Sequence, residues 1–210
     1  MSKKEEFEPE LIEYIGPAGA GKTTLAKKQI KELRAKGVRV LTFQFYKKHK
    51  LILIYDLLRF PFFILKERKQ TKTIWNLFKK DIKTTTKIKQ TITTMFIIFK
   101  TNNLIRRAKK KRIKKVIIDQ GLVQKMTGLI FFGFIKKASS KNIKFILNNN
   151  NLKIKFITAE ENKVVIRRKK RQNKIDKKSS EIILFENKKA TKIKKEFVKK
   201  NNLKYEFIKN

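Results

Sequence analysis

The segment that most constrains this chain is a glycine-rich octapeptide near its N-terminus, Gly16–Thr23, with the sequence GPAGAGKT. It matches the pattern G-x-x-x-x-G-K-[ST] in full. An apolar run, Leu11–Ile15, precedes it, and a helix-forming segment, Thr23–Lys36, follows it and ends at Gly37. A strand before this pattern and a helix after it are the context in which it forms a phosphate-binding loop.

Each residue type in the loop suits the binding of a nucleoside triphosphate. Glycines allow backbone conformations that are closed to other residues, so consecutive N–H groups can point at one phosphate. Lys22 is expected to reach the β- and γ-phosphates, Thr23 to bind Mg²⁺, and Thr24 to support the α-phosphate. The alternative is a glycine-rich turn before an ordinary helix. The sequence therefore predicts ATP and Mg²⁺ as cofactors, held by Gly16, Pro17, Ala18, Gly19, Ala20, Gly21, Lys22, Thr23 and Thr24.

A second candidate site residue is Asp119, which ends the apolar run Val116–Ile118. Phosphate-loop proteins place the acid that holds Mg²⁺, or a water of its shell, at the end of such a strand. We therefore predict Thr23 and Asp119 as the metal-binding residues. Two alternatives stay open for Asp119: it caps the next turn without a catalytic role, or it acts as base toward an acceptor hydroxyl.

Segments typical of strands alternate with segments typical of helices along the chain. This alternation predicts an α/β fold with a doubly wound, parallel five-stranded sheet. The predicted strands are Leu11–Ile15, Val38–Phe45, Lys115–Asp119, Lys153–Thr158 and Tyr205–Ile208. The predicted helices are Thr23–Lys36, most of residues 50–112, Gly121–Lys137, Ser140–Asn150, Glu160–Arg171 and Glu181–Lys200. Threonines in residues 84–94 weaken the helix prediction there, because β-branched residues are poorer helix formers.

Two other classes of phosphate-loop protein fit less well. Asn173–Asp176 matches the guanine-reading pattern N-K-x-D, but a basic run precedes it where a GTPase has an apolar strand. The magnesium-side motif D-x-x-G is also missing, since Gly121 lies one position too close to Asp119. Motor and recombination ATPases usually need a longer chain. A small-molecule kinase is the favoured class.

The chain resembles the thymidylate kinase-like group of nucleotide and nucleoside kinases. The residues that carry the resemblance are Gly16–Thr24, Val116–Gly121 and Thr158–Arg171. In that family a helix after the fourth strand runs into an Arg-x-x-x-Arg pair at a mobile lid, and Arg167 and Arg171 have this spacing. The alternative for these arginines is a solvated basic helix.

The resemblance implies a nucleoside monophosphate kinase-like phosphate-loop fold in one domain, 1–210. It also implies a helical acceptor region at about 46–112 and a lid at about 159–180. The implied activity is transfer of the γ-phosphoryl group of ATP to a nucleotide, nucleoside or other small acceptor. The implied catalytic residues are Lys22, Asp119, Arg167 and Arg171.

The acceptor side departs from that family. Gln120 stands where thymidylate kinases have an arginine that holds the acceptor phosphate. The segment Thr42–Lys47 lacks the acid that nucleoside kinases use as a base. Arg59 beside Phe60 and Phe62 is one candidate acceptor contact, but core packing of these aromatics is the favoured interpretation.

The composition is strongly basic, with 56 Lys and Arg against 17 Asp and Glu, a net charge of +39. Such a charge attracts polyanions; drift in base composition is the favoured explanation, because the lysines are spread along the chain. With no Cys and one His, the chain offers no disulfide, thiolate or histidine-cluster metal site.

A small-molecule phosphoryl acceptor is the expected partner, and a homodimer is compatible with the sequence. Two apolar segments with nearby basic residues, Leu51–Leu65 and Leu129–Ile135, are either helices that pack on the sheet, which is favoured, or docking elements for an anionic membrane. The basic segment Arg106–Lys115 suggests nucleic-acid binding as a further, less favoured alternative. No signal peptide or spanning segment is evident, so a cytoplasmic location is the default expectation.

Overall fold

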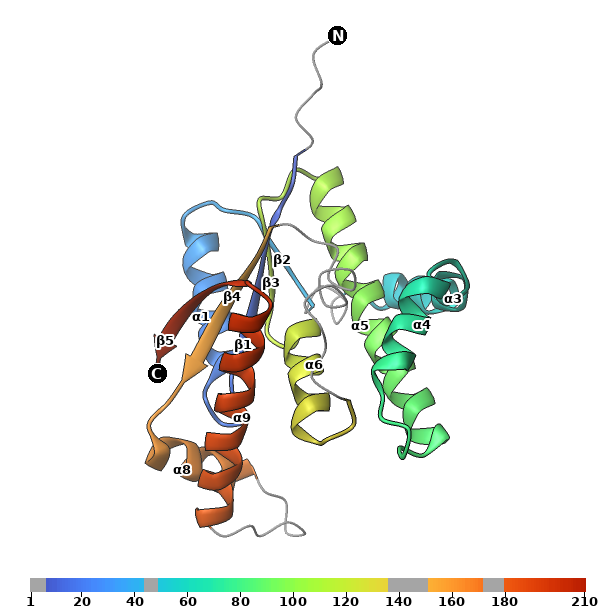
Figure 1. The fold of residues 1–210 in the computed structure, drawn as a ribbon. Helices are drawn as coiled ribbons and strands as arrows, with labels where there is room; N and C mark the ends of the chain where they lie inside the picture. The colour runs from blue at the N-terminus through green and yellow to red at the C-terminus, as the bar shows by residue number, and fades with distance from the viewer. Residues whose placement is uncertain (1–6, 44–48, 136–150, 172–179) are drawn as a thin grey trace.

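The computed structural model describes residues 7–43, 49–135, 151–171 and 180–210 (Figure 1). Its centre is a sheet of five parallel strands in the order β2-β3-β1-β4-β5. The strands are β1 (Glu10–Ile15), β2 (Val40–Thr42), β3 (Lys115–Ile118), β4 (Leu152–Thr158) and β5 (Lys204–Lys209). This arrangement, with helices on both faces, confirms the predicted α/β fold with a doubly wound five-stranded parallel sheet.

Helices cover both faces of the sheet (Figure 1). They are α1 (Lys22–Ala35), α3 (Lys50–Lys66), α4 (Arg68–Leu77), α5 (Thr84–Lys110), α6 (Leu122–Phe131), α8 (Glu161–Arg171) and α9 (Ser180–Lys200). In Figure 1, α3 and α4 lie beyond α5, away from the sheet. No helix in the described ranges is long and apolar enough to cross a bilayer.

The sheet has a separate core on each face, because side chains alternate along each strand. On one face, Leu11 and Ile118 pack in a large cluster with residues of α4, α5, α6 and α9. On the other face, Ile12 and Ile117 pack with Ala26 and other residues of α1. The strands are buried on both sides, which explains their nearly continuous apolar sequence.

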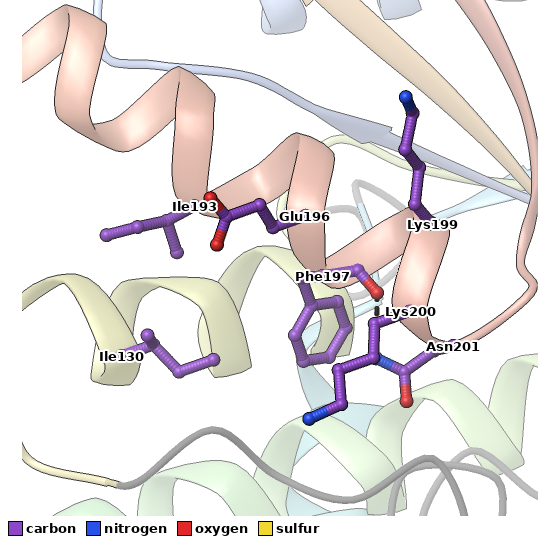
Figure 2. Close-up of a pocket in the computed structure, with 7 residues that line it drawn as sticks. All are labelled: Ile130, Ile193, Glu196, Phe197, Lys199, Lys200 and Asn201. Atoms are coloured by element: carbon purple, nitrogen blue, oxygen red, sulfur yellow. Dashed lines mark hydrogen bonds between the residues drawn. The ribbon is translucent and has the colours of Figure 1, made fainter.

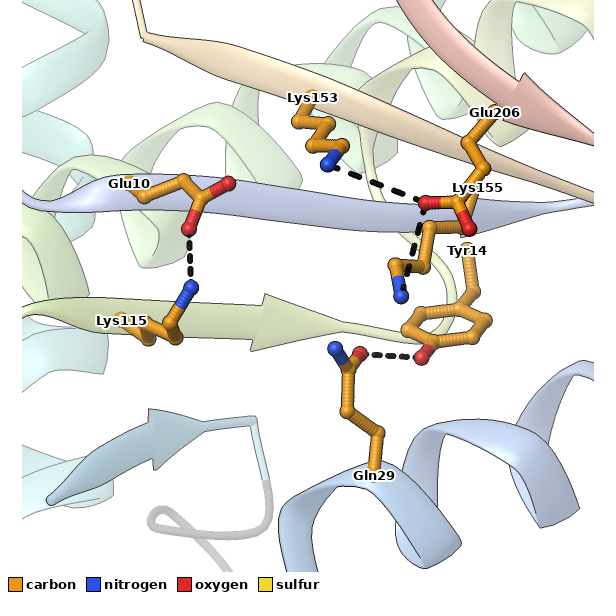
Figure 3. Close-up of polar contacts among 7 residues, drawn as sticks. All are labelled: Glu10, Tyr14, Gln29, Lys115, Lys153, Lys155 and Glu206. Atoms are coloured by element: carbon orange, nitrogen blue, oxygen red, sulfur yellow. Dashed lines mark hydrogen bonds and ion pairs between the residues drawn. The ribbon is translucent and has the colours of Figure 1, made fainter. Parts of the chain in front are cut away.

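The face that α1 covers also carries charged and polar side chains (Figure 3). Lys153 and Lys155 of β4 each lie 3.8 Å from a carboxylate oxygen of Glu206 on β5. The Tyr14 phenol donates a hydrogen bond to Gln29 of α1. Burial raises the pKa of Tyr14 above its usual range, so the phenol remains the donor. These contacts tie α1 and β5 to the sheet.

The region predicted as helical over most of residues 50–112 contains three helices, with breaks at Glu67 and in residues 78–83. The threonine-rich part is helical in spite of its β-branched residues. Thr93 and Thr94 donate their hydroxyls to the carbonyls of Lys89 and Gln90, one turn earlier. The strand predicted at residues 38–45 is observed over Val40–Thr42, and residues 44 and 45 lie outside the described ranges. The helix predicted at residues 140–150 also lies outside them.

Candidate active site

The loop between β1 and α1 has a backbone that requires glycine. Gly21 is the N-cap of α1 and has φ +90°, in the left-handed region. Gly16 has φ +153°, and a Cβ there would collide with the backbone carbonyl of Ile157 in β4. β1 lies between β3 and β4 in the sheet, so the loop lies at the carboxyl edge where ligands of doubly wound sheets bind.

The Lys22 side chain folds back over this loop. Its Nζ atom lies 2.9 Å from the carbonyl oxygen of Gly16 and 2.8 Å from that of Pro17, and donates to both. The ammonium group is therefore held above the backbone that would cradle the phosphates. Thr24, which was predicted to support the α-phosphate, lies on the first turn of α1 and is exposed.

A second lysine reaches the loop from the C-terminal helix. Lys194 of α9 is buried, and its Nζ donates to the same Gly16 carbonyl at 3.0 Å. Burial, together with the nearby charge of Lys22, lowers the pKa of Lys194 from 10.5 to about 7. This residue was not predicted, because nothing distinguishes one lysine among many in residues 188–200.

The structure brings together the two predicted metal-binding side chains. Thr23 begins α1 after β1, and Asp119 follows β3, the neighbouring strand. The Thr23 hydroxyl donates to Asp119 Oδ2 at 3.0 Å. A hydroxyl and a carboxylate beside a phosphate loop fit Mg²⁺, which takes few protein ligands and completes its shell with phosphate and water oxygens.

A buried carboxylate organises the segment after Asp119. Glu13 of β1 accepts hydrogen bonds from the backbone N–H groups of Val123 and Gln124, at 3.1 and 2.8 Å, in the first turn of α6. Burial outweighs these hydrogen bonds and raises the pKa of Glu13 from 4.5 to about 7. The Glu13 carboxyl group of β1 thus caps the N-terminus of α6, whose first turn has no acid of its own.

A second contact links α6 to the phosphate loop. Gln124 accepts a hydrogen bond from the Gly16 backbone N–H through Oε1 at 3.2 Å. A Cβ at Gly121 would lie 2.5 Å from the Glu13 carboxyl carbon, so only glycine lets the chain pass this close. Glu13 could have been suspected from the sequence, because a charged residue inside an apolar strand needs a buried partner.

Arg167, predicted from its spacing, reaches the phosphate loop from α8. One guanidinium nitrogen donates to the Gly19 carbonyl at 3.3 Å. The Asn210 amide after β5 also donates to the loop, to the Ala20 carbonyl at 2.9 Å. Arg171 ends α8, and its side chain lies outside the described residues, as do residues 172–179 of the predicted lid.

A cleft of about 1070 Å³ opens beside the loop and combines two kinds of lining residue. One set is the predicted nucleotide site: Ala18, Gly19, Gly21, Lys22, Thr23 and Asp119. The other set comes from α5, from α6 and from the residues that follow β2 and α6. It is rich in aromatic rings and polar side chains: Phe43, Gln90, Phe96, Lys100, Gln124, Lys125, Phe132 and Phe134. The phosphate loop and this aromatic and polar wall therefore line the same cavity.

The polar groups of the second set contact their neighbours in defined ways. Lys125 donates to the Gln90 side-chain carbonyl at 2.6 Å. The Lys100 ammonium lies 4.8 Å from the ring centre of Phe43 and 5.4 Å from that of Phe96. Burial lowers the pKa of both lysines from 10.5.

The alternative acceptor contact on α3 is not part of this cleft. Arg59 is exposed and lies over the Tyr55 ring, 5.3 Å from its centre, and Phe62 is exposed as well. Phe60 packs against Phe96 and Phe99 of α5, as core packing predicts. Neither Arg59 nor the two phenylalanines line the cleft.

A separate cavity of about 390 Å³ lies between α6 and α9 (Figure 2). Ile130, Ile193 and Phe197 give it a largely apolar wall. Its lining includes no residue of the phosphate loop, so it is distinct from the candidate active site.

Comparison with known proteins gives similarity at the level of structure only. No family model and no curated protein sequence matches the chain. The solved structures that match include deoxyadenosine kinase from M. mycoides with the products dCMP and dCDP bound, at 16% identity, with 95% of this chain and 89% of that chain covered and a TM-score of 0.45.

The same enzyme with bound dATP matches at 15% identity, with 95% and 90% of the two chains covered and a TM-score of 0.45. The YorR protein from Bacillus subtilis, in complex with phosphorylated GDP, matches at 15% identity, with 95% and 85% covered and a TM-score of 0.49. At such low identity, what this chain does has to follow from its own residues.

Proposed function

We propose that this chain is an ATP-dependent small-molecule kinase, which transfers the γ-phosphoryl group of Mg-ATP to a nucleoside, a nucleotide or a similar small acceptor. The observation that carries the proposal is the cleft of about 1070 Å³, lined both by the phosphate loop and by an aromatic and amide-rich pocket. A hydrolase needs room only for water beside the γ-phosphate, whereas this cleft has room for an organic acceptor.

On the donor side, the backbone N–H groups of residues 16–21 would hold the phosphates of ATP, and Lys22 would neutralise their charge. Thr23 and Asp119, whose Oγ1 and Oδ2 atoms lie 3.0 Å apart, would hold Mg²⁺. When bound, the metal would offset the negative charge that develops on the phosphate oxygens. Arg167, which already contacts the loop, would stabilise the transferred phosphoryl group. Arg171 is proposed for the same role only because it lies four residues after Arg167.

On the acceptor side, the lining favours a planar heterocycle. Aromatic rings of the lining, such as Phe132 and Phe134, would hold such a ring by stacking. The Gln90 amide offers both a donor and an acceptor for its edge. These groups suit the base of a nucleoside or nucleotide better than a sugar or an aliphatic alcohol.

Two lysines offer a replacement for the missing acceptor arginine. Gln120, which occupies that position, lines the cleft but carries no charge. Lys100 and Lys125 line the same cleft and would attract an acceptor phosphate. A thymidylate kinase-like preference for a nucleoside monophosphate is therefore compatible with the pocket, and Asp119 remains the candidate base if the acceptor is a nucleoside hydroxyl.

The proposal is tested by offering Mg-ATP labelled in the γ-phosphate to separate groups of acceptors: deoxynucleosides, deoxynucleoside monophosphates, sugars and lipid-extract alcohols. We expect a labelled product from one of the two nucleoside groups and none from the sugars. ATP hydrolysis without any phosphorylated product, stimulated by polyanions or vesicles, would instead indicate an ATPase.

A further inference from the structure

Helix α3 carries an apolar stripe that faces solvent. Five of its members recur at intervals of three or four residues and the sixth, Tyr55, lies next to Ile54, so all six share one side of the helix. Their exposed fractions reach 82% at Leu51 and 71% at Phe62, far from the values of a core residue. The stripe consists of Leu51, Ile54, Tyr55, Leu58, Phe62 and Leu65.

The opposite side of α3 is anchored, which fixes the direction of the stripe. Phe60 and Phe63 contact aromatic residues of α5, with the ring centres of Phe63 and Phe99 5.0 Å apart. Asp56 is buried on this inner side, and its carboxylate lies 3.6 Å from the Arg107 guanidinium of α5. The helix is thus apolar on both sides. The favoured sequence interpretation, packing on the sheet, holds only in part for α3: its inner side packs on α5 and joins the main core cluster, and its other side is uncovered among the described residues.

Positive charge borders the stripe. Arg59 and Lys66 of α3 are exposed, and α4 follows with the exposed residues Arg68, Lys69 and Lys72. The one acid within α3 is Asp56, which points inward to Arg107. The described surface around the stripe therefore combines apolar side chains with basic ones, in a chain whose net charge is +39.

We propose that α3 docks in the interface of an anionic lipid bilayer. The stripe would enter the boundary between headgroups and acyl chains, while the flanking arginines and lysines contact anionic headgroups. With 17 residues, α3 is about 25 Å long and would lie in the plane of the membrane. This inference goes beyond the proposed kinase function and does not depend on it.

Charge complementarity favours a bilayer over a second copy of this chain. Two copies that joined through α3 would bring their Arg59 and Lys66 side chains, and two net charges of +39, close together. An anionic membrane buries the same apolar side chains and attracts the same cations.

The first test is co-sedimentation with vesicles of phosphatidylcholine containing about one-third phosphatidylserine. We expect binding that falls about tenfold or more in the double variant Leu58→Ser/Phe62→Ser. The matched control is Ile88→Ser/Ile92→Ser, which removes two exposed apolar residues of α5 and should bind like the unmodified chain. Equal binding by all three proteins would show plain electrostatic adsorption and overturn the proposal.

The second test uses the lack of cysteine in the chain. A fluorophore sensitive to polarity is attached to Leu58→Cys or, as a control, to Ala35→Cys, which is exposed on α1. Vesicles should shift the emission to the blue at position 58 and leave it unchanged at position 35. A blue shift without lipid that grows with protein concentration, together with a dimer in analytical ultracentrifugation, would assign the stripe to self-association and contradict the proposal.

Discussion

Cationic side chains gather at the carbonyl oxygens of the phosphate loop. Lys22 and Lys194 both donate to the Gly16 carbonyl, and Arg167 donates to that of Gly19. The buried Lys194 is the least expected of the three, since an amine at this depth is costly unless it has a partner. Its hydrogen bond to the Gly16 carbonyl indicates that it holds the loop in shape.

Replacement of Lys194 should therefore weaken nucleotide binding. We expect Lys194→Met to raise the Kd for Mg-ATP by up to about tenfold, because loss of one hydrogen bond that shapes the loop costs roughly 0.5–1.5 kcal/mol. The matched control is Lys192→Met, on the exposed side of the same helix. Isothermal titration calorimetry gives both values, and an unchanged Kd in Lys194→Met would show that the contact is unimportant to binding.

Glu13 should make stability depend on pH. Its pKa rises from 4.5 to about 7 on folding, so the folded state binds more protons than the unfolded state between these values. The contribution to stability is complete below pH 4.5 and is lost as the pH rises through 7, by about 3 kcal/mol at most. Urea unfolding from pH 4.5 to 8 measures this loss, which should be smaller in Glu13→Gln. An equal pH dependence in the variant would contradict the assignment.

At the scale of elements, the strand ends decide the geometry of the site. β1 ends in the phosphate loop and β3 ends at Asp119, and their adjacency brings Thr23 and Asp119 within a hydrogen bond. The helix α6 is fixed to both, through Glu13 at its N-terminus and through Gln124 to Gly16. Loop, acid and α6 thus form one connected unit.

Gly121, the N-cap of α6, and Gly128, within α6, distinguish the close approach of Glu13 from ordinary helix propensity. Gly121→Ala should destabilise the fold by roughly 1–3 kcal/mol, because its Cβ would lie 2.5 Å from the Glu13 carboxyl carbon. Gly128→Ala has nothing within 4 Å of the added Cβ and should be neutral or stabilise by up to about 1 kcal/mol. Urea denaturation compares the two, and equal effects would refute the close approach of Glu13.

Much of the fold could be predicted because local signals agreed with one another. The alternation of buried strands with helices predicted the sheet. The glycine-rich loop and the acid after the third strand predicted the site residues Lys22, Thr23 and Asp119. Lys194 and Gln124 could not be predicted, since each lies in an ordinary helical sequence and only tertiary packing brings it to Gly16. The outward stripe of α3 also depends on packing, which hydrophobic periodicity does not report.

At the scale of the whole molecule, two surfaces are set apart. The cleft lies at the carboxyl edge of the sheet, where the loops after β1 and β3 meet, and α5 and α6 supply its second wall. Helix α3, which carries the stripe, lies on the far side of α5 from the sheet (Figure 1). Membrane docking through α3 would therefore leave the cleft accessible to small substrates.

The most direct test of the central claim is the rate of γ-phosphoryl transfer to the preferred acceptor by Lys22→Ala, beside Lys27→Ala as its match on the exposed side of α1. We expect a loss of at least about a hundredfold in kcat/KM for Lys22→Ala and nearly unchanged transfer for Lys27→Ala, with both variants folded. Full activity of Lys22→Ala would contradict the assignment of the phosphate loop as the catalytic centre.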